Sequence, residues 1–119
     1  MTEYLIAHAS FAAPFMSDTG ETFVEAETPQ EALQRFRAKY THPAGLYAAT
    51  CYASADDFMK GRQPLAKWLC NHELKMIEAT KGKTSYSFLG KEPGVFVIDD
   101  VTYRVSDPKD GRIVTGETA

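Results

Sequence analysis

The segment 21–31 changes within a few residues from a strand pattern to a helix start, and this constrains the fold more than any other feature. Its first part alternates as a half-buried strand does, with an acidic face in water: Thr22, Val24 and Ala26 against Glu21, Phe23, Glu25 and Glu27. Thr28, Pro29 and Glu31 then supply the cap, the first-turn proline and the capping-box acid of a helix. A strand that leads directly into a helix predicts a sheet with a helix packed on it.

The predicted helix continues to about residue 40. Ala32, Leu33, Phe36 and Tyr40 share one face at helical spacing, so this apolar stripe should pack against the sheet. Residues 41–45 contain a proline and a glycine and should end the helix.

The middle of the chain shows further strands and one long helix. Residues 3–11 and 46–53 carry apolar or small side chains on both faces, which predicts two inner strands. Residues 12–20 are expected to form a connecting loop, and residues 54–61 a short capped helical turn. The longest predicted helix, 64–80, is apolar over such a wide arc that it should be covered from more than one side.

The last third is predicted to contain short strands at 85–89, 95–98, 101–105 and 112–115. Residues 107–111, Asp-Pro-Lys-Asp-Gly, are typical of a hairpin turn between the last two. The order β-β-α-β-α-β-β-β-β predicts one α+β domain over residues 1–119. We expect a mainly antiparallel sheet with the two main helices packed on one face.

The composition fits one ordinary globular domain. At 119 residues and 44% hydrophobic side chains, the chain is long enough for a core and too apolar for disorder. No apolar run approaches the ~20 residues that span a bilayer, and the N-terminus lacks the basic region of a secretory signal. Cys51 and Cys70 lie in apolar stretches and are expected to be reduced core thiols. These features predict a cytoplasmic protein without a membrane contact.

Charge is distributed very unevenly along the chain. Residues 1–34 contain six acidic side chains and no lysine or arginine, whereas residues 60–91 contain seven basic side chains against two acidic ones. Basic residues interleaved with aromatic ones are typical of nucleic-acid sites. The candidates for such a site, or for contact with another partner, are Lys60, Arg62, Lys67, Lys75, Lys81, Lys83, Tyr86 and Phe88. The sequence pI of about 5.6 and the helix ends favour the alternative, ordinary solvated charges.

No catalytic, metal or cofactor motif is present in the sequence. Four cysteines and histidines lack the paired spacing of a zinc site: His42, Cys51, Cys70 and His72. His72 should be a core or boundary histidine with one hydrogen-bond partner, and Asp99-Asp100 is more typical of a turn than of a metal site. We therefore expect no cofactor and no catalysis. A small-molecule or enzymatic pocket near His8, Cys51 and Asp99 is the alternative.

Residues 20–33, Gly-Glu-Thr-Phe-Val-Glu-Ala-Glu-Thr-Pro-Gln-Glu-Ala-Leu, resemble the strand and capped helix of HicB-type antitoxins, which neutralise small RNA-cleaving toxins. The resemblance covers about a fifth of the chain. Where those proteins continue into a DNA-binding segment of the helix-turn-helix or ribbon type, this sequence has an apolar helix pattern and β hairpins. The resemblance implies an antitoxin-like regulatory role without placing the chain in the family.

The excess apolar surface of the predicted 64–80 helix favours contact with another protein chain. We therefore expect a small non-enzymatic interaction or regulatory protein that acts through protein–protein contact. Self-association as a homodimer would cover that helix. Nucleic-acid binding through the basic residues is the first alternative, and the pocket near His8 is the second.

Overall fold

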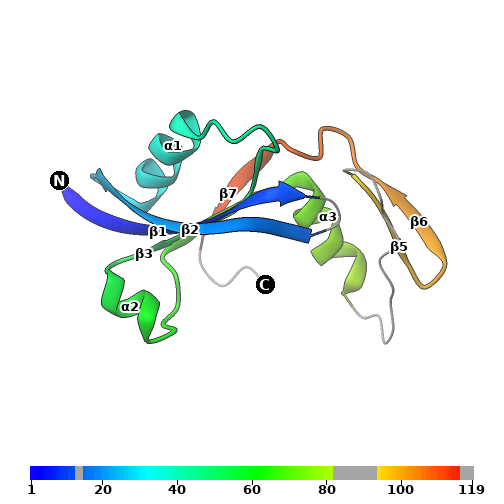
Figure 1. Cartoon of the computed structure of the whole chain (residues 1–119). Coiled ribbons are helices and arrows are strands. Elements are labelled where there is room, and N and C mark those ends of the chain that lie inside the picture. Colours follow the sequence, from blue (N-terminus) through cyan, green and yellow to red (C-terminus); the bar gives the residue numbers. More distant parts are fainter. Residues whose placement is uncertain (13–14, 82–93, 116–119) are drawn as a thin grey trace.

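The computed structural model describes residues 1–12, 15–81 and 94–115, and it confirms an α+β fold built on antiparallel strands. The main sheet has the order β2-β1-β3-β4-β7, and β5 and β6 form a separate two-stranded sheet beside α3 (Figure 1). The strands are β1 (Thr2–Ala12), β2 (Phe15–Ala26), β3 (Leu46–Tyr52), β4 (Ala66–Cys70), β5 (Val95–Ile98), β6 (Val101–Arg104) and β7 (Gly111–Thr115). The helices are α1 (Pro29–Lys39), α2 (Ala55–Met59) and α3 (Asn71–Thr80). In the described ranges, no helix is long and apolar enough to cross a membrane.

β1 and β3 are inner strands, as predicted, because each has a paired neighbour on both sides. Strict alternation along residues 3–11 predicts that Phe11 shares a face with Leu5 rather than with Ile6, and this is wrong. A register shift between His8 and Ser10 marks a β-bulge, and Phe11 consequently packs in the same core as Ile6. A period of two along the sequence does not reveal such a bulge.

The loop predicted over residues 12–20 is mostly strand. β2 begins at Phe15, so β1 and β2 form one long hairpin that pairs from Thr2 with Ala26 to Ala12 with Phe15. Asp18 has a backbone φ of 48°, a left-handed conformation that Asp tolerates better than most residues. The polar residues that resemble a loop in the sequence are therefore accommodated inside an irregular strand.

The α1 helix starts and packs as its sequence predicts. Thr28 Oγ1 accepts a hydrogen bond from Glu31 N at 3.1 Å, and Glu31 Oε1 accepts one from Glu27 N at 2.7 Å. Three residues of its apolar stripe are buried against the main sheet: Ala32, Leu33 and Phe36. This helix covers one face of the sheet, where it contacts β1, β2, β3 and β4.

Replacing the capping hydroxyl, Thr28→Ala, is expected to lower the free energy of unfolding by about 1 kcal/mol, because it leaves an amide of the first turn without its partner. Urea unfolding measures this difference. Thr28→Ser keeps the oxygen and should stay close to the wild type. Equal losses in the two variants would show that the hydroxyl does not cap α1.

The prediction of one helix over 64–80 is wrong in its first part. Residues 66–70 form β4, in which the first, third and fifth side chains are buried, and α3 begins only at Asn71. The Cys70 Sγ caps α3 by accepting a hydrogen bond from Glu73 N at 3.4 Å. A buried strand followed at once by a helix produces one continuous apolar stretch, and hydrophobic periodicity does not reveal the boundary between the two elements. α1 contacts β1, β2, β3 and β4, whereas α3 contacts β4, β5 and β7.

The predicted hairpin between strands 101–105 and 112–115 is also wrong. Residues 107–110 do form a turn, in which Asp110 N donates to Asp107 O at 3.0 Å. The turn carries the chain back to the main sheet, where β7 pairs with β4, while β6 pairs with β5. The strand predicted over 85–89 lies outside the described residues.

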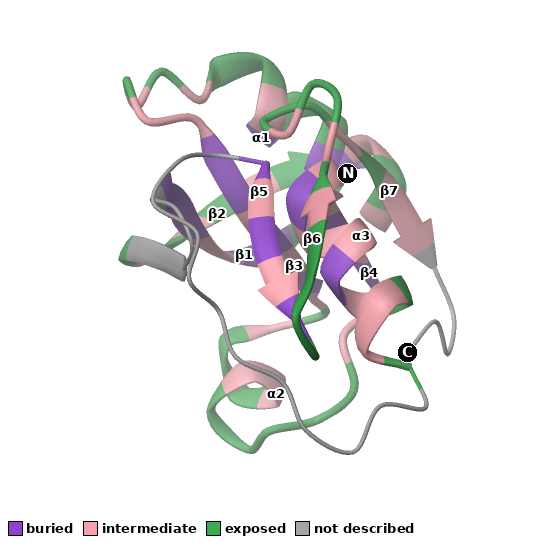
Figure 2. Cartoon of the chain, turned by 90° about the vertical axis from the view of Figure 1, so that its right-hand side faces the viewer, coloured by how far each residue is buried: buried purple, intermediate pink, exposed green. Residues whose placement is uncertain are grey.

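Two hydrophobic cores result from this topology. The larger lies between α1 and the main sheet, and the smaller joins α3 to the β5–β6 hairpin through Met76, Phe96 and Ile98 (Figure 2). His72 is fully buried between them, and its ring centroid lies 5.4 Å from that of Phe11 and 5.3 Å from that of Phe96. Its Nδ1 accepts a hydrogen bond from Gly94 N at 2.9 Å, which confirms a core histidine with a hydrogen-bond partner.

Candidate functional site

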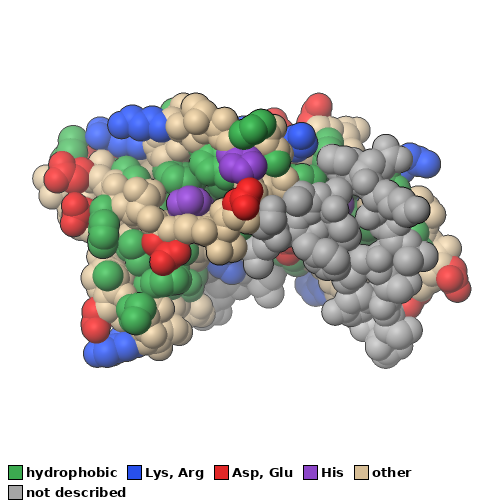
Figure 3. All heavy atoms as spheres, viewed as in Figure 1, with side chains coloured by type: hydrophobic (Ala, Val, Ile, Leu, Met, Phe, Trp, Pro, Cys, Tyr) green, Lys and Arg blue, Asp and Glu red, His purple; other side chains and the backbone are tan. Residues whose placement is uncertain are grey.

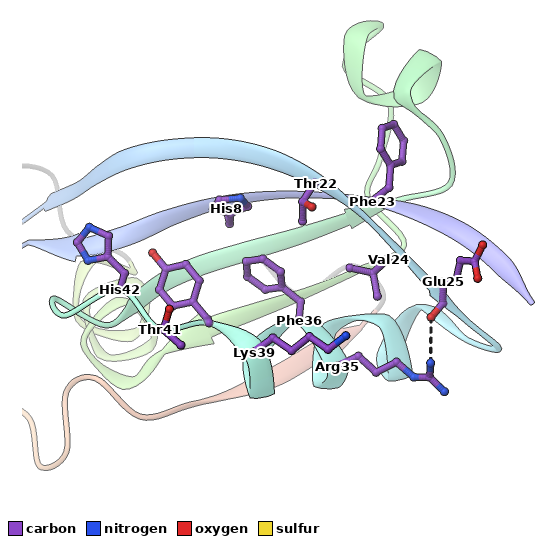
Figure 4. A pocket seen from close by; sticks show the side chains of 11 residues that line it. His8, Thr22, Phe23, Val24, Glu25, Arg35, Phe36, Lys39, Thr41 and His42 are labelled. Atoms are coloured by element: carbon purple, nitrogen blue, oxygen red, sulfur yellow. Dashed lines mark hydrogen bonds between the residues drawn. The ribbon is translucent and has the colours of Figure 1, made fainter.

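A groove of about 810 Å³ opens between α1 and the β1–β2 part of the main sheet. β1 contributes His8, β2 contributes residues 22–25, and α1 with the turn after it contributes residues 35, 36 and 39–42. In Figure 4, Thr22, Val24 and Phe36 point into the space between β2 and α1, whereas the side chains of Phe23 and Glu25 point away from it. Phe23 and Glu25 therefore line the groove mainly through their backbone.

Four aromatic rings follow one another along the groove. The ring centroids of His8 and Phe36 lie 4.9 Å apart, those of Phe36 and Tyr40 5.5 Å, and those of Tyr40 and His42 6.2 Å. Such a row offers large, weakly polar surfaces on which apolar or aromatic groups pack well. The groove is thus suited to side chains rather than to a phosphate or a metal ion.

His8 is the least well satisfied polar group of the groove. Its ring lies over the paired residue Gly20, where an added Cβ would come within 3.0 Å of Cε1. Among the described residues, the buried Nδ1 has no hydrogen-bond partner. Burial lowers the pKa of His8 below its usual 6.5, against the weaker opposing effect of Glu21. His8 is therefore neutral near pH 7 and adds an uncharged ring to the groove.

His42 is held firmly at the far end of the groove. Its Nδ1 accepts a hydrogen bond from Ala44 N at 3.0 Å, so in the neutral ring Nε2 carries the proton and donates it to Asp18 Oδ2 at 2.8 Å. The ring stacks on Tyr40 with an interplanar angle of 14°. Asp18, from the irregular part of β2, thus joins the edge strand to the turn after α1.

β2 lies at the edge of the main sheet, and its outer edge opens onto the groove. Among the described strands, only β1 pairs with it. The backbone carbonyl of Glu25 accepts a hydrogen bond from Arg35 Nη1 at 3.4 Å, so this carbonyl points away from β1 (Figure 4). Because backbone direction alternates along a strand, the N–H and C=O groups of Phe23 and Glu21 point outward as well. Outward-facing backbone groups of an edge strand can pair with another extended chain.

At this edge, the sheet face opposite α1 carries acidic side chains around an apolar one. Glu21, Phe23 and Glu25 are all exposed there, and Phe23 keeps 53% of its surface accessible. Glu25 pairs directly with the exposed Glu3 of β1. Among the described residues, none of these three glutamates forms an ion pair. Figure 3 shows acidic side chains bordering hydrophobic ones over this part of the molecule.

The basic residues singled out in the sequence lie on several separate elements. Lys60 pairs with Asp56 at 3.1 Å, and Arg62 pairs with Asp57 at 3.5 Å, both beside α2. Lys67 lies on β4. Lys75 lies on α3, where it pairs with Glu78 at 3.5 Å, and Lys81 follows α3. Lys83, Tyr86 and Phe88 lie outside the described residues. Lys67 and Lys75 therefore lie on different elements, a strand and a helix.

His8, Cys51 and Asp99 do not line one pocket. His8 lines the groove, Cys51 is fully buried on β3, and Asp99 lies in the turn between β5 and β6. Cys51 and Cys70 are free and buried, as predicted, and burial raises the pKa of each thiol to about 11. Neither thiol is thus available as a nucleophile near pH 7. Within residues 1–12, 15–81 and 94–115, no three metal-ligating side chains come together.

Most of the groove is not predicted by the sequence. Val24, Phe36 and Tyr40 were expected only as core residues of a strand and a helix, and His8 as part of another pocket. The acidic alternation of residues 21–27 was the available signal, since it marks a strand with one wet face. The sequence does not reveal that this strand lies at an edge.

No protein-family model, curated protein or solved structure matches the chain. The resemblance of residues 20–33 to HicB-type antitoxins stays a prediction.

Proposed function

We propose that the chain is a non-catalytic interaction protein that binds an extended segment of another protein along β2. The observation that carries the proposal is the outward-facing backbone of Glu21, Phe23 and Glu25 beside a groove of about 810 Å³. An added strand would gain main-chain hydrogen bonds from this edge. Its alternate side chains would enter the groove and supply specificity.

The groove favours a protein segment over the other classes. Its rings at Phe36 and Tyr40 suit apolar side chains, and its length follows the strand rather than closing around a compact ligand. The homodimer was predicted from the apolar surface of one helix over residues 64–80. Because β4 and α3 replace that single helix, its apolar surface does not support self-association.

Blocking the outward backbone at one residue tests the proposal. Phe23→Pro removes an amide that does not pair with β1, so the fold should be kept while an added strand loses a central hydrogen bond. Peptides selected on the wild type from a displayed library of random 12-residue sequences are expected to bind this variant at least about tenfold more weakly. Fluorescence anisotropy measures the affinities, and circular dichroism checks the fold.

Phe23→Thr is the matched control, because it removes the same ring and keeps the amide. Its affinity should remain well above that of Phe23→Pro. Equal affinity of the selected peptides for wild type and Phe23→Pro would rule out strand addition at this edge.

A further inference from the structure

We infer that the segment bound at the β2 edge is a basic one, with a cationic residue at each end of a short apolar stretch. This inference rests on the proposed function and names the chemistry of its partner. It follows from which side chains of β2 an added strand would meet on each face of the sheet.

The face opposite α1 selects for positive charge. A residue directly opposite another on a neighbouring strand lies about 5 Å from it, Cβ to Cβ, so side chains opposite Glu21 and Glu25 would meet exposed carboxylates. Glu3 lies one strand further in, directly across from Glu25, and adds to the negative potential there. Lysine or arginine is favoured at both positions, and an acidic residue is disfavoured.

The residues between the two cationic positions must be apolar. The one opposite Phe23 meets an exposed aromatic ring on the acidic face. The two opposite Thr22 and Val24 point to the other face, toward the groove and Phe36. The pattern is therefore basic, apolar, apolar, apolar, basic in an extended conformation.

The same charges disfavour a second copy of this chain as the occupant. Antiparallel pairing of two β2 strands centred on Phe23 would place Glu21 of each copy against Glu25 of the other. Pairing centred on either glutamate would place that glutamate against its own equivalent. Like charges directly opposite one another destabilise a strand pair, so a cationic partner segment is preferred over self-pairing.

A synthetic peptide with the inferred pattern tests this. Acetyl-Ser-Lys-Val-Phe-Val-Lys-Ser-amide, carrying a fluorescent label, is titrated with the full chain at low salt, alongside the same peptide with both lysines replaced by glutamate. We expect the lysine peptide to bind at least about tenfold more tightly, and the difference to shrink at 0.5 M salt as screening increases. Glu21→Lys/Glu25→Lys should reverse the preference.

A control variant separates local from overall charge. Asp56→Lys/Glu78→Lys changes the net charge equally, at side chains that are 67% and 74% exposed on α2 and α3. It should leave the preference for the lysine peptide nearly unchanged. If it abolishes the preference as fully as the β2 variant does, the inference is overturned.

N-methylation of the peptide separates the inference from the proposed function. Methylation of the central phenylalanine amide, which faces β2 in antiparallel pairing with Phe23, should abolish binding, whereas methylation of a valine amide should not. If the glutamate peptide binds as tightly as the lysine peptide and the methylation pattern holds, the basic partner is wrong and strand addition stands. If binding is unaffected by methylation at any position, or if both peptides fail to bind, the inference and the proposed function are both overturned.

Discussion

Gly111→Ala is expected to lower the free energy of unfolding by about 3 kcal/mol or more, the upper end of what an overfilled site costs. A Cβ at residue 111 would lie 2.6 Å from Trp68 Cζ2 and 2.9 Å from Cys70 Cα, and it would also overlap the backbone carbonyl of Leu69. Two of these neighbours are backbone atoms of β4, so no side-chain rotation relieves the clash. β7 must move away from β4. Urea unfolding followed by the fluorescence of Trp68, the single tryptophan of the chain, measures the loss.

Gly61→Ala provides the matched control for this substitution. Gly61 has a φ of +67°, and an added Cβ there would meet no atom within 4 Å. It should therefore cost only the backbone strain of a left-handed alanine, about 1 kcal/mol. The φ of Gly111 is not positive, so the stability lost in Gly111→Ala measures steric overlap alone. A smaller loss at Gly111 than at Gly61 would contradict the close approach of β7 to β4.

His72→Leu is expected to lower the free energy of unfolding by about 3 kcal/mol at neutral pH. The substitution leaves the buried Gly94 amide without an acceptor and removes the ring between Phe11 and Phe96. Amides of β5 and β6 should then exchange with deuterium faster, because His72 joins the smaller core to the larger. His72→Asn retains an acceptor close to the position of Nδ1 and should lose less stability.

The same histidine should make the stability of the fold depend on pH. Burial lowers the pKa of His72 below its usual 6.5, so the unfolded chain takes up a proton before the folded one does. The contribution of His72 to the free energy of unfolding is therefore complete above pH 6.5. It is lost as the pH falls toward the lowered pKa of the folded state, by at most about 1.4 kcal/mol per pH unit. Burial also lowers the pKa of His8, so protonation of His8 likewise favours the unfolded chain as the pH falls.

Thermal unfolding between pH 5 and 7.5 measures this effect. The wild type should lose stability at the acid end, whereas His72→Asn and His72→Leu should show a flatter profile that retains only the share of His8. Unchanged pH dependence in both variants would mean that His72 does not titrate in this range.

The sequence predicts those helices and strands whose capping residues and apolar pattern match the packing seen in the structure. The Thr28–Glu31 cap and the stripe of Leu33 and Phe36 specify α1 and the face it buries, because both are set within a few turns of one helix. The two-sided apolar patterns of β1 and β3 likewise indicate inner strands. Fold class follows from these elements together.

Features that depend on distant partners could not be predicted in this way. Residues 66–70 become a strand because β3 and β7 pair with them, although their apolar side chains fit a helix as well. The return of β7 to β4 rather than to β6 has no signal in the turn at 107–110. The groove depends on β2 lying at an edge, and strand order is a property of the whole sheet. A candidate site that depends on strand order therefore cannot be predicted from local hydrophobic periodicity.

Strand order also has a consequence for synthesis on the ribosome. Residues 2–70 contain the first four strands of the main sheet, whose ladders can form as soon as they emerge. The fifth, β7, is made only after α3 and the β5–β6 hairpin, so β4 has one neighbour during that interval. Unpaired edges favour association between nascent chains, and a lysine on an edge strand discourages it. Lys67 is the second of the five residues of β4. This lysine thus reduces aggregation of the nascent sheet at β4, whose second neighbour is the last strand of the sheet to be synthesised.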